Sequence, residues 1–124
     1  MKTPEQSNPI FVYEVNLTIE IPIFNQHKTW LIEHFHDMVT KNNFMELKLF
    51  FVKNTDPTND EYLRYQKIVA QYYISDYKIL QDYLEKQSKK MRSQVIEKLG
   101  YHYSVSRRVF ELAETFKSTS KSSL

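Results

Sequence analysis

The sequence predicts a single α+β domain in which four strands and two helices follow one another in the order β-α-β-β-α-β. Strands are indicated by segments in which apolar and polar residues alternate, and helices by two segments in which apolar residues recur every three or four positions. The length of 124 residues fits one domain, and a hydrophobic fraction of 41% is enough for a core. The nine tyrosines and eight phenylalanines argue against general disorder.

The first strand is predicted over residues 10–21, where the alternation is unbroken. Its apolar residues share one face: Phe11, Tyr13, Val15, Leu17, Ile19 and Ile21. Pro22 ends this strand, and a helix follows that is predicted to have Asn25 as its N-cap. Asn42 or Asn43 is predicted to supply the left-handed residue that ends the helix. The apolar stripe of the helix contains Trp30, Leu31, Phe35, Met38 and Val39.

Two further strands are predicted on either side of a polar loop. The second strand covers residues 44–52 and directs four side chains inward: Met45, Leu47, Leu49 and Phe51. The Asp-Pro and Asn-Asp pairs within residues 53–60 are typical of a loop with turns. The third strand covers residues 62–75, and its more apolar face contains Ile68, Ala70, Tyr72 and Ile74.

A long second helix is predicted over residues 76–99, with Ser75 as its cap. Its core stripe contains Leu80, Leu84, Met91 and Val95. Gly100, the only glycine of the chain, follows at the position where helices commonly need a residue with positive φ. The last strand is predicted over residues 101–112.

Joined by right-handed crossovers, this order of elements gives the ferredoxin-like fold. In that fold four strands form an antiparallel sheet and both helices cover one of its faces. We expect the domain to span residues 10–112, between a disordered N-terminal segment, residues 1–9, and a polar C-terminal tail, residues 113–124.

The composition excludes several classes of function. The chain has no cysteine, so disulfides, thiolate zinc sites and thiol nucleophiles are absent. A single glycine leaves no room for a glycine-rich phosphate loop. The polar N-terminus lacks the apolar region of a signal peptide, and no apolar run reaches the ~20 residues that span a bilayer. We therefore expect a bacterial protein of the cytoplasm with no membrane association.

The segment EHFHD, residues 33–37, concentrates two histidines and two carboxylates in the middle of the first predicted helix. His34 and His36 are two positions apart, about 200° around a helix, so they point to opposite sides and cannot bind one metal together. Histidines of helical zinc sites stand four positions apart. We expect no metal site and no cofactor here.

His34 and Arg107 are the two candidates for a chemical role. His34 lies one turn from Trp30 and Met38, at the edge of the apolar stripe, where it is either held by a hydrogen bond at the helix rim or directed into a pocket. Arg107 shares its strand parity with the apolar residues of the last strand and either faces the helices or reaches solvent from the strand end. A buried arginine needs a partner, for which Glu33, His34 or Tyr72 is available.

The outward face of the predicted sheet mixes apolar and acidic residues. Glu14 and Glu20 on the first strand oppose phosphate binding, and the basic-aromatic signature of RNA-binding sheets is missing, so we expect no nucleic-acid partner. The outward apolar residues instead predict an interface in a homodimer: Val12, Phe44, Phe50, Val69, Tyr73 and Phe110. The alternative is a monomer whose sheet face is solvated.

Five stretches of the sequence together resemble a family of short bacterial proteins catalogued as a domain of unknown function: YEVNLTIE at 13–20, EHFHDMVTKNNF at 33–44, VAQYYISD at 69–76, YLEKQSKKMRSQVIEKLG at 83–100 and SRRVFEL at 106–112. The most specific matches are Glu33-His34, Gln71-Tyr72, Met91-Arg92, Leu99-Gly100 and Arg107. The resemblance implies a dimeric α/β-barrel type of ferredoxin-like fold and no particular activity. Asn42 departs from it, because the family tends to have glycine there.

Two functions remain open on these observations. The first is a homodimeric module that binds a small molecule or a protein partner, for which we expect Glu33, His34, Tyr72 and Arg107 to form the binding residues. The alternative is a cofactor-independent enzyme, monooxygenase-like or isomerase-like, with a cleft between helices and sheet. In that enzyme His34 would be the acid or base, Arg107 the anion holder and Tyr72 the hydrogen-bond donor.

Overall fold

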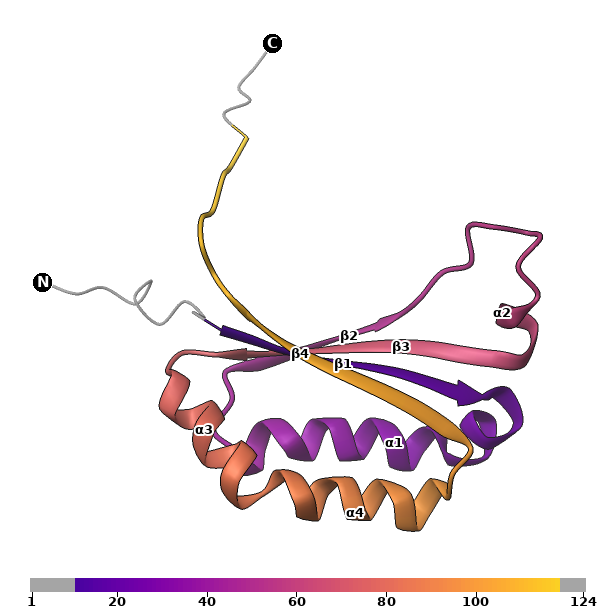
Figure 1. Ribbon diagram of the computed structural model, residues 1–124, viewed down its shortest axis with the longest axis horizontal. Helices are drawn as coiled ribbons and strands as arrows, with labels where there is room; N and C mark the ends of the chain where they lie inside the picture. The colour runs from indigo at the N-terminus through magenta and orange to yellow at the C-terminus, as the bar shows by residue number, and fades with distance from the viewer. Residues whose placement is uncertain (1–10, 119–124) are drawn as a thin grey trace, which may run out of the picture.

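The protein is built from two layers, an antiparallel sheet and a set of helices on one of its faces. The computed structural model describes residues 11–118. Figure 1 shows the three longest helices on the same side of the sheet, with the opposite side left open. The segment predicted to be disordered, residues 1–9, lies outside the described residues.

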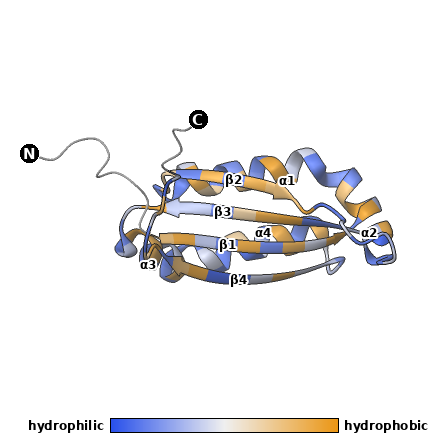
Figure 2. Cartoon of the chain, turned by 90° about the horizontal axis from the view of Figure 1, so that it is seen from above, coloured by the Kyte–Doolittle hydropathy of each residue, from blue (hydrophilic) through white to orange (hydrophobic). Residues whose placement is uncertain are grey.

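Eight elements follow one another along the described chain: β1 (Phe11–Glu20), α1 (Ile21–Lys41), β2 (Glu46–Phe51), α2 (Glu61–Arg64), β3 (Tyr65–Ile74), α3 (Tyr77–Lys86), α4 (Ser88–Leu99) and β4 (Tyr103–Glu111). The strands lie in the order β2-β3-β1-β4, and every neighbouring pair is antiparallel. Figure 2 looks onto the sheet and shows this order with the helices behind it. The predicted order of six elements is not reproduced in that form, because the described residues contain four helices.

Helix α1 begins earlier than its sequence predicts. Its first residue is Ile21, and Pro22 lies in the first turn, where a missing amide hydrogen costs no hydrogen bond. Asn25 was the predicted N-cap and lies inside the helix instead. At the other end the prediction is confirmed, because Asn43 has a positive φ of 59° and the side chain of Asn42 donates to the carbonyl of Met38.

The predicted second long helix is divided into α3 and α4. Gln87 separates them with φ −121°, outside the helical range, and the hydroxyl of Ser88 donates to the carbonyl of Leu84 at 2.7 Å. A serine that bonds back to the preceding turn in this way commonly bends a helix. Tyr83 lies in the core, three positions after the buried Leu80 on α3, whereas Leu84, a predicted core residue, is exposed.

Both predicted ends of that helical region can be compared with the structure. The cap is Asp76 and not Ser75, because the carboxylate of Asp76 accepts a hydrogen bond from the amide of Lys78. Gly100 does end α4 with a positive φ of 67°, as predicted, a conformation that strains any residue with a Cβ atom.

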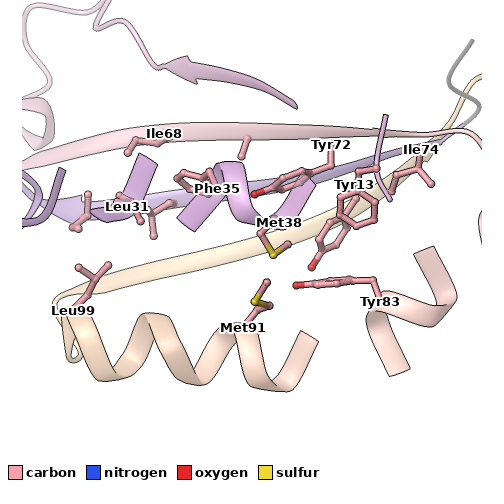
Figure 3. Close-up of a cluster of buried hydrophobic side chains, with 14 of the residues drawn as sticks. Tyr13, Leu31, Phe35, Met38, Ile68, Tyr72, Ile74, Tyr83, Met91 and Leu99 are labelled. Atoms are coloured by element: carbon pink, nitrogen blue, oxygen red, sulfur yellow. The ribbon is translucent and has the colours of Figure 1, made fainter. Parts of the chain in front are cut away.

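The core fills the space between the sheet and the helices, and the labelled side chains of Figure 3 lie within it. The alternation predicted for β1 is confirmed, since Tyr13, Leu17 and Ile19 are buried. Strand β2 differs, because the predicted inward residues Met45 and Phe51 are exposed. The buried apolar residues are Tyr13, Leu17, Ile19, Phe24, Leu31, Phe35, Met38, Phe44, Ile68, Ala70, Tyr72, Ile74, Leu80, Tyr83, Met91 and Leu99.

Phe44 was predicted on the outward sheet face and lies in the core instead. It is 5% exposed, and its ring centroid is 5.4 Å from that of Tyr72 and 5.6 Å from that of Tyr83. The physical reason is that β2 begins at Glu46, so Phe44 belongs to the turn after Asn43 and does not follow the alternation of the strand. Phe44 is therefore unavailable for a sheet-to-sheet interface.

No helix among residues 11–118 is both long enough and apolar enough to cross a membrane.

Candidate ligand-binding site

A cavity opens between the helices and the inner face of the sheet. The cavity has a volume of about 50 Å³, and the whole depression, counted out to the solvent at its mouth, about 510 Å³. Its walls come from β1, α1, β3, α3, α4 and β4. The structure brings His34, Tyr72 and Arg107 together in these walls, although they are far apart in the sequence.

Glu33 is not part of this cavity. Its side chain is exposed on the outer surface of α1, where it lines a separate polar depression with residues of α4. The placement follows from helix geometry, because neighbouring residues point about 100° apart, and His34 is the one that faces inward. The predicted binding set is thus divided between the interior and the surface.

Three tyrosine rings form one end of the cavity. Tyr13 lies between the other two, with ring centroids 6.1 Å from Tyr72 and 5.7 Å from Tyr83. Burial raises the pKa of Tyr72 well above its ordinary value, and burial with the neighbouring Tyr13 also raises the pKa of Tyr83. Both phenols therefore carry their protons at neutral pH and are able to donate hydrogen bonds.

The hydroxyl of Tyr13 is buried and makes no hydrogen bond of acceptable geometry within residues 11–118, although it lies close enough to the Tyr83 hydroxyl to raise the pKa of that group. The side chain is only 2% exposed, so water does not replace the missing partner freely. In Figure 3 the hydroxyl groups of Tyr13 and Tyr83 and the sulfur atoms of Met38 and Met91 point toward the same space. An unpaired buried hydroxyl costs about 1–3 kcal/mol, which makes it uncommon in a purely structural position.

His34 is buried against aromatic rings. It is 9% exposed, and its ring stacks on Trp30 with a centroid distance of 5.1 Å and an angle of 18°. Burial lowers the pKa of His34; Asp37 opposes this change and Lys41 adds to it. The imidazole is therefore neutral at pH 7, with one nitrogen able to accept a proton.

His34 has no hydrogen bond to another side chain of the described chain, so the predicted rim hydrogen bond is not present there. His36 is exposed, on the other side of α1 as the helix geometry predicts. Across residues 11–118, no three histidine or acidic side chains gather in a way that would bind a metal ion.

Two arginines reach the cavity from opposite walls. Arg107 pairs with Val15 across β1 and β4, which directs its side chain toward the helix-covered face, and its exposure shows that it also reaches solvent, so it combines the two predicted placements. Arg92 enters from α4. Both line the cavity together with Tyr83, and their positive charges oppose the rise in its pKa that burial causes. The two residues are exposed overall, which places the positive charge at the mouth of the cavity.

Arg92, Tyr13 and Tyr83 also line the cavity and were not predicted as site residues. Tyr13 was predicted only as a core residue, without a role for its hydroxyl. Tyr83 lies three positions after the core residue Leu80, and this spacing was the available signal for it. Arg92 follows the core residue Met91, and this Met-Arg pair was the one available signal for it.

The open face of the sheet carries a second polar cluster, centred on Glu14. Its carboxylate accepts hydrogen bonds from Gln71 at 3.0 Å, Asn16 at 3.0 Å and the Nε of Arg108 at 2.8 Å, and the hydroxyl of Tyr73 donates to Gln71. Glu14 is only 4% exposed. Burial acts to raise the pKa of Glu14, but the three hydrogen bonds together outweigh it and lower the pKa.

Apolar side chains flank this cluster on the same face. Val12 lies opposite both Tyr73 and Phe110, and Phe50 lies opposite Val69. These five are the predicted interface residues that do lie on the open face. Phe50 is 47% exposed and Phe110 is 38% exposed, so the described chain leaves part of this apolar surface in contact with water.

A match to a family model identifies the protein family of this chain. The model described as Domain of unknown function (DUF4286) matches residues 10–113. The chain belongs to this family. The match covers the whole sheet and all the helices, so the cavity and the Glu14 cluster both lie within the family domain. A comparison with curated proteins finds no match.

Solved structures support the ferredoxin-like fold. A dimeric ferredoxin-like protein from an uncultured marine organism is similar with a TM-score of 0.62 and 10% identity, over 87% of this chain and 99% of that chain. A variant of SnoaB, a cofactor-independent oxygenase from Streptomyces nogalater, is similar with a TM-score of 0.55 and 10% identity, over 87% and 98%. At this identity the likeness shows a shared fold and no shared chemistry.

Proposed function

We propose that this DUF4286 protein is a homodimer that binds a small organic molecule in the cavity between its helices and its sheet. The observation that supports binding is the buried hydroxyl of Tyr13, which lacks a partner in the described chain and lines an apolar cavity with His34, Tyr72 and Arg107. A mostly apolar cavity with a few convergent polar groups is the usual form of a ligand site.

The proposed dimer is of the α/β-barrel type, with two open sheet faces packed against each other. Val12, Phe50, Val69, Tyr73 and Phe110 would supply its apolar contacts. The carboxylate of Glu14 already has its hydrogen bonds within one subunit, so covering it would leave no unpaired charge. The similar structure described as a dimeric ferredoxin-like protein also supports this arrangement.

Solution mass tests the dimer. Light scattering of the wild type is expected to give twice the chain mass of 15.0 kDa, and Val69→Asp is expected to give a monomer, because it places a charge in the apolar surface. Ile96→Asp, on the exposed side of α4, is the matched control and should remain dimeric. A monomeric wild type would contradict the proposal.

Methionine methyl NMR tests the binding site directly. In protein labelled at the methionine methyl carbons, benzyl alcohol is expected to shift the signals of Met38 and Met91, which line the cavity. Met45 lies outside the cavity on an exposed position and is the internal control. If no small aromatic compound moves Met38 or Met91, the cavity is not a ligand site.

A cofactor-independent enzyme is the second candidate, and the burial of His34 favours it. A neutral imidazole in an apolar wall is able to take a proton from a carbon beside a carbonyl group, while the electron pair moves to the carbonyl oxygen and the Tyr72 hydroxyl donates to the enolate. The proton returns from the imidazolium to the same carbon. This half-reaction needs no oxidant and no metal.

Hydrogen exchange measures that step. If the protein is an enzyme, the acidic carbon-bound hydrogens of 2-tetralone should exchange faster in D2O when the wild-type protein is present than when His34→Gln or Tyr72→Phe is present. His36→Gln, which changes an exposed histidine of the same helix, is the control. Equal rates in all four proteins would contradict the enzyme and leave the binding function in place.

A further inference from the structure

We infer that the ligand is an aromatic monocarboxylate, with its ring against Phe35, Met38 and Met91 and its carboxylate between Arg92, Arg107 and the Tyr83 hydroxyl. The inference rests on the proposed binding function and adds the chemical class of the ligand. Three observations carry it: the charge balance of the walls, the character of the apolar surfaces and the position of the charge at the mouth.

The charge balance of the cavity favours an anion. Arg92 and Arg107 both line it, and no aspartate or glutamate of the described residues does. Neither arginine has an ion-pair partner among residues 11–118, whereas Arg108, on the other face of the sheet, pairs with Glu14 at 2.8 Å. Arginine binds carboxylates through two parallel hydrogen bonds, so two free guanidinium groups beside one cavity favour a carboxylate.

The neighbouring hydroxyl groups favour the same group. Tyr83 lines the cavity together with both arginines, and the buried hydroxyl of Tyr13 points into the same space. Protonated phenols supply donors, and an oxygen anion supplies an acceptor for the Tyr13 hydroxyl, which has none within residues 11–118. A carboxylate placed there would satisfy the orphaned hydroxyl and the two guanidinium groups together.

The inner walls favour a flat aromatic body. They combine the ring faces of Phe35 and Tyr72 with the thioethers of Met38 and Met91. Sulfur and aromatic groups attract each other, and the flexible methionine side chains adjust to the shape of a ring. The cavity volume of about 50 Å³ holds only a few water molecules, so movement of these two methionines makes room for the ring.

The position of the charge excludes a strongly hydrated dianion. The arginines lie at the mouth and the interior is apolar, so the ligand keeps one charged end near water and buries an uncharged body. Inorganic phosphate has no apolar part to bury and would lose much of its hydration without compensation. The site therefore selects against it.

Four probes test the class of ligand, with the Met38 and Met91 methyl signals as the measurement of binding. Benzoate is expected to bind about tenfold or more tightly than benzamide, its uncharged analogue, since hydrogen bonds to charged groups carry this difference. Benzoate is also expected to bind more tightly than cyclohexanecarboxylate and inorganic phosphate. Equal binding of benzamide would overturn the carboxylate, and equal binding of cyclohexanecarboxylate would overturn the aromatic ring.

Arginine variants place the carboxylate. Arg107→Gln and Arg92→Gln are each expected to weaken the binding of benzoate about tenfold or more and to leave the affinity for benzamide nearly unchanged. Arg64→Gln, a surface arginine of α2, removes the same charge as a control and should bind both probes as the wild type does. Loss of benzoate and benzamide together in a folded Arg107→Gln variant would overturn the assignment of the charged end.

The two proposals fail in different ways. If benzyl alcohol, benzamide and benzoate all leave Met38 and Met91 unchanged, the binding function itself is wrong. If the neutral compounds bind and benzoate has no advantage, the cavity binds small molecules and the carboxylate class is wrong.

Discussion

The two faces of the sheet differ in whether their buried polar side chains have hydrogen-bond partners. On the open face, Glu14 has three hydrogen bonds and Tyr73 donates to Gln71. On the helix-covered face, the hydroxyl of Tyr13 has no partner in the described chain, although it is just as deeply buried. Buried polar groups with complete hydrogen bonding stabilise one arrangement of strands, whereas an unpaired one reduces stability unless something else binds it. The contrast separates a structural cluster from a candidate site.

The largest difference between the faces is expected for two phenylalanines. Phe44→Ala should lower the free energy of unfolding by about 3–5 kcal/mol, because it leaves a hole between Tyr72 and Tyr83. Phe50→Ala, on the open face, should cost about 1 kcal/mol or less in the Val69→Asp background, where association does not contribute. Urea denaturation followed by circular dichroism measures both. Equal losses would mean that Phe44 is not in the core.

The Glu14 cluster should give the next largest effect. Glu14→Ala removes the acceptor for Gln71, Asn16 and Arg108 and is expected to lower the free energy of unfolding by about 2–3 kcal/mol. Glu46→Ala changes an exposed carboxylate of the neighbouring strand β2 and should stay within about 0.5 kcal/mol of wild type. A small effect of both would show that the cluster contributes little.

A matched pair of tyrosines compares the faces most directly. Tyr73→Phe removes a hydroxyl that donates to Gln71 and should cost about 1 kcal/mol. Tyr13→Phe removes a hydroxyl without a partner and should leave stability unchanged or raise it by about 1 kcal/mol. Tyr13→Phe should also weaken the binding of benzoate in the cavity. Destabilisation by Tyr13→Phe equal to that of Tyr73→Phe would contradict the contrast between the faces.

The smallest effects are expected in the dependence of stability on pH. The pKa of His34 is lowered in the folded state, so the unfolded chain binds more protons, and stability should fall as pH drops below about 6.5. His34→Gln should remove this loss. The pKa of Glu14 is also lowered, and its loss of stability should begin only below about pH 4.5. Urea denaturation at pH 7.5, 5.5 and 4.0 separates the two; a wild type unchanged between pH 7.5 and 5.5 would contradict the assignment to His34.

Much of the fold was predictable from local patterns. The alternation of β1, the helical stripe of α1 and the position of Gly100 all depend on short-range properties of the chain. The bend at Gln87 was not predictable, because it depends on the hydroxyl of Ser88 bonding back to Leu84 and not on glycine or proline. The misplacement of Phe44 has a similar origin, since it depends on where β2 begins.

The site was predictable only in part. Helix and strand periodicity alone indicated that His34, Tyr72 and Arg107 could face the same interior. Tyr83 and Arg92 come from the two separate helices α3 and α4, so their meeting in one cavity needed the structure. The environment of Glu14 depends on strand register, which places Gln71 and Arg108 directly opposite it on the two neighbouring strands. That register cannot be predicted from any local pattern of the sequence.

The bend at Gln87 also bears on how the site forms. It leaves α3 with 10 residues and α4 with 12, lengths at which isolated helices are marginal in water. The segments that carry Tyr83, Met91 and Arg92 therefore depend on contacts with the core to be helical. The walls of the cavity exist only in the completed fold, so occupancy of the cavity and global folding are thermodynamically linked: any molecule bound there stabilises the entire domain.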